Sequence, residues 1–240
     1  YKITGFLDGF HGLRLNNSVE MVKSDFSGIL TSGGTMLGTS RERIKDFDPL
    51  KKTIADHNLD GLVCFGGSAT QKLALRLKEE GVNVITLPKS ITNHIAGTEN
   101  CIGFDSALTI AAESIDRLHT TAHSHHRIIL VEIMGDDSGW LALGAGITGG
   151  ADVILIPEIP YEVSKVAAAI QERSSKGKRF SLVAVSQGAI SDEDNKFFSK
   201  AHQVNQYLRS GKEDFNEVEH QLVEIEEDFT GKSIDIAQRL

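Results

Sequence analysis

The sequence has few cysteines and no long uncharged hydrophobic run. Cys64 and Cys101 are its two cysteines, too few for a disulfide framework, and Cys64 lies in an apolar run where a buried thiol is expected. The small number of cysteines and the expected free thiol of Cys64 both favour a protein of the reducing cytoplasm. The most membrane-like stretch, residues 138–157, contains Asp152 and divides at residues 149–151 into a helix and a strand, which argues against a membrane partner.

An excess of positive charge is also lacking. Acidic residues outnumber basic ones 33 to 25, and the net charge of −8 argues against a nucleic-acid partner, although a few arginines suffice to bind a sugar phosphate. Hydrophobic residues make up 40% of 240 residues, enough for the core of one large α/β domain or two lobes. Because the chain begins at Tyr1 and not at methionine, we expect a processed, trimmed or partial sequence.

Several catalytic motifs are missing. The sequence contains neither the Gly-X-Ser-X-Gly hydrolase elbow nor a Gly-x-x-x-x-Gly-Lys-Ser/Thr phosphate loop. His119 and His123 stand four residues apart, as zinc ligands on a helix do, but Thr120 occupies the place of the zinc-protease glutamate. We therefore favour a structural or interface role over a metal site for the cluster of His119, His123, His125 and His126.

What the sequence does contain is an alternation of short β-branched runs with longer amphipathic ones. This pattern predicts an α/β protein with a mainly parallel sheet, and the continuous apolar character of the strands predicts that both of their faces are covered. The predicted strands are 60–65, 82–87, 127–134, 152–156 and 180–185, and the predicted helices are 49–57, 70–80, 105–121, 138–148 and 163–173.

The last part of the chain has a different amino-acid composition. After Gln187 the sequence becomes polar and charged. Residues 191–196 are predicted to form a loop, and residues 213–228 a strongly acidic helix that lies on the surface or faces a partner.

Three glycine-rich turns are the strongest local signals. Residues 62–70 run from a strand through Gly66 and Gly67 into a helix, which points backbone N–H groups at one spot suited to an anion. Residues 32–41 combine small hydroxyl residues with Arg41, which can contact phosphate oxygens. Each turn alone also fits an ordinary turn or surface loop. Together with residues 131–139, they indicate a ligand cleft at the carboxyl ends of strands.

Nine segments of this sequence resemble the phosphofructokinases in order and spacing. They are residues 33–41, 66–67, 87–93, 97–98, 102–108, 115–118, 124–127, 131–135 and 149–158. The resemblance covers roughly residues 5–189, and residues 119–160 are most similar to the bacterial branch that includes pyrophosphate-dependent enzymes. It implies two Rossmann-like three-layer α/β/α lobes with mainly parallel sheets: residues 1–103 for the phosphoryl donor, incomplete at the N-terminus, and 104–240 for the sugar phosphate.

The activity that this resemblance implies is a step of glycolysis, Mg²⁺-dependent phosphoryl transfer from ATP or pyrophosphate to the C1 hydroxyl of fructose 6-phosphate. Arg41 would contact the transferring phosphoryl group. The donor phosphates would lie at Gly66, Gly67, Ser68, Ala69 and Lys89, and the sugar at Ser90, Met134, Gly135 and Gln187. Arg127 would reach the 6-phosphate bound by a neighbouring subunit, which implies a homo-oligomer, a dimer or a tetramer.

The sequence departs from the family pattern at the positions that carry the catalytic and ligand-binding groups. Thr92 and His94 replace two aspartates, the first of which is the family's base; Ser68 replaces an acid that serves Mg²⁺, Asp136 a cation and Gln187 a glutamate. Losing a general base alone costs about 10²–10⁴ in rate.

Two functions therefore stay open: a phosphotransferase that is slow or uses His94 as its base, and a non-catalytic regulatory subunit that binds a sugar phosphate or nucleotide. The substitutions favour the second. The donor is open too, since the small Ala69 suits ATP whereas Lys89 is typical of pyrophosphate users.

Overall fold

A computed structural model describes residues 2–42, 44–196 and 199, so the predicted acidic helix at 213–228 lies outside the described residues. The chain divides into two compact units, Tyr1–Pro88 and Lys89–Leu240. All five predicted strands and all five predicted helices are confirmed, as β3 to β7 and α2 to α6. The functional lobes that the resemblance implies stay a prediction.

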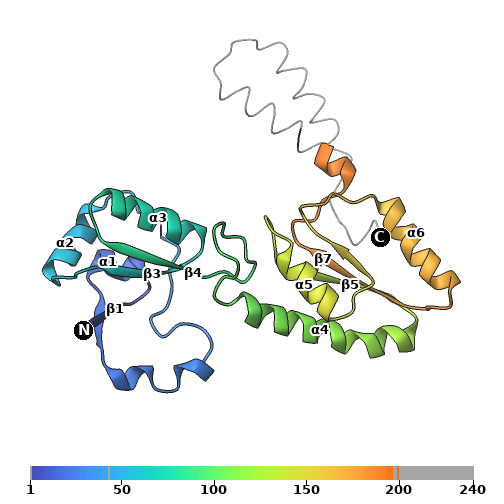
Figure 1. Cartoon of the computed structure of the whole chain (residues 1–240), viewed down its shortest axis with the longest axis horizontal. Helices are drawn as coiled ribbons and strands as arrows, with labels where there is room; N and C mark the ends of the chain where they lie inside the picture. The colour runs from blue at the N-terminus through green and yellow to red at the C-terminus, as the bar shows by residue number, and fades with distance from the viewer. Residues whose placement is uncertain (1, 43, 197–198, 200–240) are drawn as a thin grey trace, which may run out of the picture. The chain divides into compact units, whose positions relative to one another are not determined.

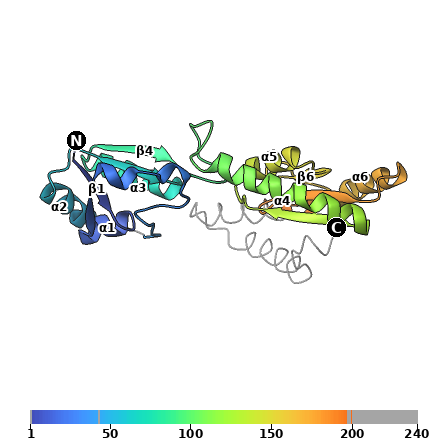
Figure 2. The same ribbon diagram turned by 90° about the horizontal axis from the view of Figure 1, so that it is seen from below.

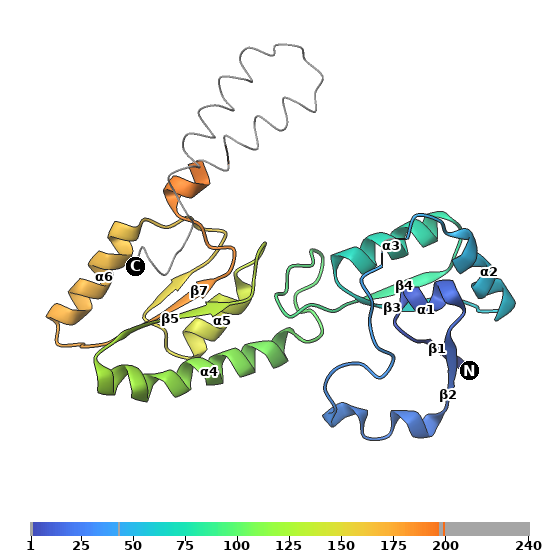
Figure 3. The ribbon, with the colours of Figure 1, turned by 180° about the vertical axis from the view of Figure 1, so that it is seen from behind.

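The first unit begins with elements that the sequence did not predict. Strands β1 (Ile3–Phe6) and β2 (Ser18–Met21) pair antiparallel and are connected by helix α1 (Phe10–Leu15), and the short 3₁₀ helices η1 (Lys23–Phe26) and η2 (Ile29–Thr31) follow β2 (Figure 3). Four-residue strands and a six-residue helix are too short to show a clear hydrophobic period, so they left no readable signal.

The core of the first unit lies on one face of a small parallel sheet. Strands β3 (Leu62–Gly66) and β4 (Val84–Pro88) pair in parallel and contact α3 (Ser68–Glu79), and α2 (Asp48–Asp56) joins the same core (Figure 2). Leu50 and Leu77 are fully buried there. The opposite face exposes Val63, Phe65 and Ile85, at 60%, 60% and 62%. The prediction of two covered faces was wrong for this sheet, because the described helices of the unit pack on one side.

The second unit has three layers. Its parallel strands lie in the order β5 (Ile128–Ile133), β7 (Ser181–Ser186), β6 (Val153–Leu155), and every residue of the central β7 is buried. Alternate side chains of a strand point to opposite faces. Leu182 and Ala184 therefore pack with α4 (Phe104–His125) and α5 (Trp140–Thr148), whereas Val183 and Val185 pack with α6 (Val163–Ser175) (Figure 1).

Two other sequence predictions meet the structure here. The apolar stretch 138–157 divides into α5 and β6, as predicted, and no helix in the described part of the chain is long and apolar enough to cross a membrane. Residues 192–196 are helical, however, where a loop was predicted. The reason is local: Ser191 Oγ accepts the Asp194 N–H at 3.1 Å and donates to the Asp194 carboxylate at 2.7 Å, which caps the helix start.

The predicted structural role of His119 and His123 is confirmed. The Nε2 atom of His119 lies 2.8 Å from the Gly149 carbonyl oxygen, which joins α4 to the turn after α5. Both imidazoles meet the Phe180 ring edge-on, with centroids 6.0 and 5.7 Å away. The two histidines thus help to hold α4 against the sheet.

Candidate functional site

Three of the sugar-binding positions expected from the resemblance, Met134, Gly135 and Gln187, meet at the carboxyl edge of the second unit's sheet. Ile133 and Ser186 end β5 and β7 side by side, and the Gln187 N–H donates to the Ile133 carbonyl at 2.8 Å. The Gly135 carbonyl accepts the Ser186 hydroxyl at 2.7 Å and the Gly188 N–H at 2.8 Å. These bonds bring residues 134–136 beside residues 187–188, where ligands of parallel sheets commonly bind.

The exposure of these positions suits contact with a polar ligand. Gly135 is buried, while the side chains of Asp136 and Gln187 are exposed and that of Met134 is 57% exposed. An amide such as that of Gln187 can both donate to and accept from a sugar hydroxyl.

The base loop, residues 88–94 with their continuation to residue 102, is closed by backbone and amide bonds. Lys89 and Ile102 form an isolated parallel bridge, and the Ser90 N–H donates to the Ile102 carbonyl at 3.1 Å. Asn93 adopts a left-handed backbone with φ of 55°, which asparagine tolerates better than most residues. Its side chain accepts the Cys101 N–H at 2.8 Å and donates to the Glu99 carbonyl at 2.9 Å.

Two hydroxyls and an imidazole form a compact group in this loop. The Nδ1 atom of His94 lies 2.8 Å from Thr92 Oγ1 and 2.9 Å from Ser90 Oγ, and the two oxygens are 3.2 Å apart. Ser90 is 8% exposed and also accepts the Thr92 N–H at 3.2 Å. Thr92 is half-buried and His94 is exposed, so the group has a buried end and a solvent-facing end.

Hydrogen bonds that the sequence did not predict connect this loop to the sheet edge and fix the start of α5. Ser138, 5% exposed, donates its hydroxyl to the Thr92 carbonyl at 2.9 Å. The next residue, Gly139, donates its N–H to both carboxylate oxygens of Glu158, at 2.9 and 3.1 Å, directly before α5. A carboxylate is favourable at a helix N-terminus. Ser138 lies in the glycine-rich turn 131–139 and Glu158 ends the segment 149–158, but nothing in the sequence showed which partners these two residues bind.

Arg127 lies at the other end of β5 from these residues. Its carbonyl accepts the N–H of Ser181, the first residue of β7, at 3.3 Å, and its side chain is exposed. Six strand residues span about 20 Å. Arg127 is therefore remote from the sugar positions of its own chain.

The predicted donor-phosphate turn is built as expected in the first unit. Gly66 ends β3, Gly67 precedes the first turn of the twelve-residue helix α3, and a Cβ on Gly66 would collide with the Thr70 side chain. Ser68 opens that helix with a hydroxyl in place of an acid, and Ala69 is exposed. Lys89 is also exposed, but it belongs to the second unit.

These residues do not fit a protein-held Mg²⁺ ion. The hard cation prefers carboxylate oxygens, and the expected position offers the neutral hydroxyl of Ser68. Within residues 2–42 and 44–196, no group of three histidine, cysteine, aspartate or glutamate side chains is placed to hold a metal. Cys64 is not a ready ligand either, since burial raises the pKa of its thiol to about 11.

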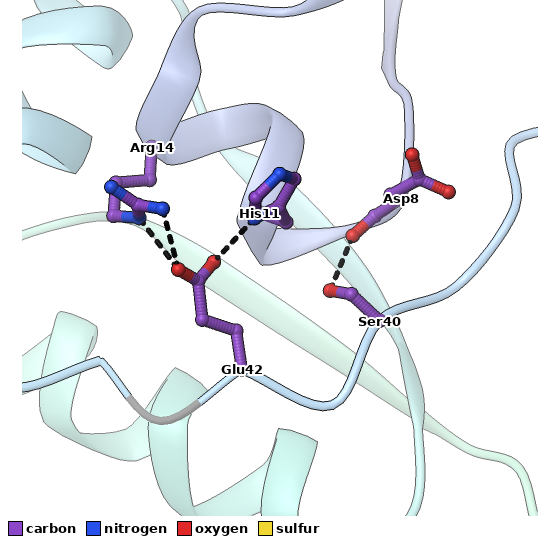
Figure 4. A network of polar contacts seen from close by, with 5 residues as sticks. All are labelled: Asp8, His11, Arg14, Ser40 and Glu42. Atoms are coloured by element: carbon purple, nitrogen blue, oxygen red, sulfur yellow. Dashed lines mark hydrogen bonds and ion pairs between the residues drawn. The ribbon is translucent and has the colours of Figure 1, made fainter.

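The two neighbours of Arg41, Ser40 and Glu42, attach their loop to α1 and to the residues just before it, as Figure 4 shows. Ser40 donates its hydroxyl to the Asp8 carbonyl at 2.6 Å, and the Asp8 N–H donates to the Leu37 carbonyl at 2.7 Å. Arg41 itself is exposed.

Glu42 makes the second attachment of this loop. Its Oε1 atom accepts from Nε and from a terminal nitrogen of Arg14, each at 2.7 Å, and its Oε2 atom lies 3.1 Å from His11 Nδ1. The hydrogen bond from Arg14 lowers the pKa of the Glu42 carboxyl below its ordinary value.

A sequence model described as phosphofructokinase matches residues 1–231. The chain belongs to the phosphofructokinase family. It is 53% identical over 203 residues to an ATP-dependent 6-phosphofructokinase of Propionibacterium freudenreichii, covering 80% of this chain and 54% of the relative. It is 47% identical over 208 residues to one of Spirochaeta thermophila, covering 81% and 57%. The chain thus spans little more than half the length of these curated relatives.

Solved structures of the family share the fold. The phosphofructokinase of Saccharomyces cerevisiae matches with a TM-score of 0.73 at 28% identity, covering 93% of this chain and 32% of that one. A pyrophosphate-dependent phosphofructokinase of Nitrosospira multiformis matches with a TM-score of 0.73 at 20% identity, covering 80% and 53%. The predicted phosphofructokinase-like α/β fold with parallel sheets is confirmed.

Proposed function

We propose that this chain supports a phosphofructokinase reaction in which His94 replaces the missing base and acts through the hydroxyl of Thr92. The observation that carries this proposal is the 2.8 Å separation between Thr92 Oγ1 and His94 Nδ1. A threonine hydroxyl is not a useful base at neutral pH, but an imidazole titrates there. This separation supports His94 as a base that acts one hydroxyl away from the position that lost its carboxylate.

The proton transfer balances without a further reactant. The C1 hydroxyl oxygen of the sugar attacks the terminal phosphorus of the donor, and its proton passes to Thr92 Oγ1. Thr92 gives its own proton to His94 Nδ1, because a hydroxyl can accept and donate at once. The P–O bond to the leaving phosphate breaks with its electron pair on that oxygen, and the imidazolium returns the proton to solvent after release.

The loop bonds favour such a relay. The Thr92 carbonyl accepts the Ser138 hydroxyl at 2.9 Å, and the Thr92 N–H donates to Ser90 Oγ at 3.2 Å, so the backbone of Thr92 is held on both sides. A relay works only when its atoms are already in hydrogen-bond reach. The half-buried Thr92 and the exposed His94 also leave the imidazole a route to exchange its proton with water.

Roles for the remaining positions complete the proposal. Met134, Gly135, Ser90 and Gln187 hold the sugar, while Arg41, Lys89 and the turn at Gly66 to Ala69 hold the donor phosphates. The curated relatives are named as ATP-dependent enzymes, and the small Ala69 leaves space for a nucleoside, so we propose ATP as donor. Mg²⁺ then enters as part of the MgATP substrate. The position of Arg127 supports a homo-oligomer in which it serves the 6-phosphate of a neighbouring subunit.

A second candidate is a regulatory subunit that binds the sugar phosphate without turnover. The observation that favours it is Ser68, whose neutral hydroxyl takes the place of a metal-serving acid at the start of α3. In that case the phosphate turns persist as a binding surface.

A coupled assay of the full chain with fructose 6-phosphate, MgATP or pyrophosphate tests both candidates. Thr92→Val keeps the side-chain shape and removes the hydroxyl, and His94→Asn keeps a polar side chain and removes the base. Each is expected to lower kcat at least about 10²-fold, with calorimetric affinity for fructose 6-phosphate unchanged. Unaltered turnover in both variants would sink the relay. Sugar-phosphate binding without any turnover in the unmodified protein would establish the second candidate.

A further inference from the structure

The loop that contains Arg41 is attached on both sides of that residue, to Asp8 just before α1 and to α1 itself. On one side Ser40 binds the Asp8 carbonyl, and on the other Glu42 binds Arg14 and His11. All five of these residues lie in the first unit, and Figure 4 shows the carboxylate of Glu42 between the side chains of Arg14 and His11. The backbone of Arg41 is therefore fixed by its two neighbours.

The Arg41 side chain is left available by this arrangement. It is exposed, and within residues 2–42 and 44–196 no hydrogen bond or ion pair engages its guanidinium. Glu42, by contrast, is half-buried, with 22% of its side chain exposed, and both of its carboxylate oxygens have partners on α1. Glu42 thus holds the loop, and the preceding Arg41 presents a guanidinium that no other described side chain engages.

We infer that Glu42 is a positioning residue for Arg41, and that its contacts with Arg14 and His11 pre-organise the guanidinium for the phosphoryl donor. This inference rests on the proposed function, in which Arg41 contacts the transferring phosphoryl group. A guanidinium whose backbone is already fixed loses less conformational freedom when it binds phosphate. An isolated surface ion pair contributes little, but here one carboxylate joins three nitrogens of two side chains on α1.

The competing explanation is that Glu42 serves the stability of α1 alone. The two roles differ in what they predict for the loop and for the donor. A structural role would change the melting temperature, with equal effects on every activity of the folded protein. A positioning role changes the loop around Arg41 and the donor step in protein that is still folded.

Trypsin cleavage after Arg41 measures whether the loop is held, whatever the activity of the protein. Arg14→Gln breaks the attachment from the α1 side and leaves the Arg41–Glu42 bond unaltered as a substrate. We expect cleavage after Arg41 to become about fivefold faster in Arg14→Gln, and to return toward the original rate in Arg14→Lys. Lys2→Gln, which removes the exposed Lys2–Glu20 pair of the same unit, is the control and should leave the rate unchanged.

Kinetics of the same variants test the positioning role. Arg14→Gln and Glu42→Gln should lower kcat about tenfold, with KM for fructose 6-phosphate unchanged, while Arg14→Lys recovers most of the loss. Faster cleavage with unchanged kcat overturns the positioning role, and unchanged cleavage overturns the attachment itself.

If the unmodified protein shows no turnover, the proposed function has failed, and calorimetry with MgATP replaces the kinetic readout. Weaker MgATP binding in Arg14→Gln then supports the role of Glu42. Equal binding overturns it.

Discussion

The loop around Thr92 and the loop around Arg41 are held by different kinds of contact. Around Thr92, the holding bonds described above come from neutral groups: the amide of Asn93 and the hydroxyl of Ser138. Around Arg41, a carboxylate meets a guanidinium and an imidazole. Neutral hydrogen bonds are insensitive to salt, whereas an ion pair near the surface is screened by it. The base loop should thus keep its shape under conditions that loosen the arginine loop.

The largest effect should come from Asn93, which closes the base loop. Asn93→Ala removes both amide bonds and places alanine at φ of 55°, so we expect a loss of at least about 10²-fold in kcat through displacement of Thr92. Asn93→Asp is the matched variant, because it keeps the acceptor for the Cys101 N–H and loses the donor to Glu99. It should retain more activity than alanine. Equal activity of all three proteins would mean that this loop does not position the reacting groups.

A smaller loss is expected at Ser138. Its hydroxyl is buried and holds the Thr92 carbonyl, so Ser138→Ala should lower the free energy of unfolding by about 1–2 kcal/mol and kcat by about tenfold. Ser124→Ala is the control, since it removes a similar hydroxyl-to-carbonyl bond from an exposed position on α4. Chemical denaturation and the coupled assay measure the two effects. A control that loses as much activity as Ser138→Ala would show a general effect of losing a hydroxyl.

The same comparison shows what could be predicted from the sequence. Segments with a strong apolar signal, the amphipathic α4 and the continuously apolar β7, were predicted to within four residues of their ends, because burial of apolar side chains dictates them. The positions around Thr92, Met134 and Gln187 were found through the resemblance. Met134 and Gln187 directly follow β5 and β7, so their common location at one sheet edge follows from the parallel pairing of these strands, whereas Thr92 is joined to that edge through Ser138.

Contacts between residues far apart in the chain had no such signal. Glu42 pairs with Arg14 across 28 positions, and Ser138 binds Thr92 across 46. Nothing in a hydrophobic pattern reports which polar side chains meet, since that depends on how elements pack. The exposed face of β3 and β4 was mispredicted for the same reason. An apolar strand sequence indicates that the strand is buried, but it does not tell which part of a protein covers each face.

The smallest effect should be the response of Glu42 to pH. Its hydrogen bond with Arg14 lowers its pKa in the folded protein, so its stabilising contribution is present above the ordinary carboxyl pKa and is lost as pH falls through the lowered value. The melting temperature of the unmodified protein should therefore exceed that of Glu42→Gln at neutral pH, and the difference should shrink in acid. It should also shrink at high salt.

The corresponding difference for Ser138→Ala should stay constant under both changes, because a hydroxyl and a carbonyl do not titrate. If the Glu42 difference is equally constant, the ion pair is not what holds the arginine loop, and the contrast between the two loops is lost.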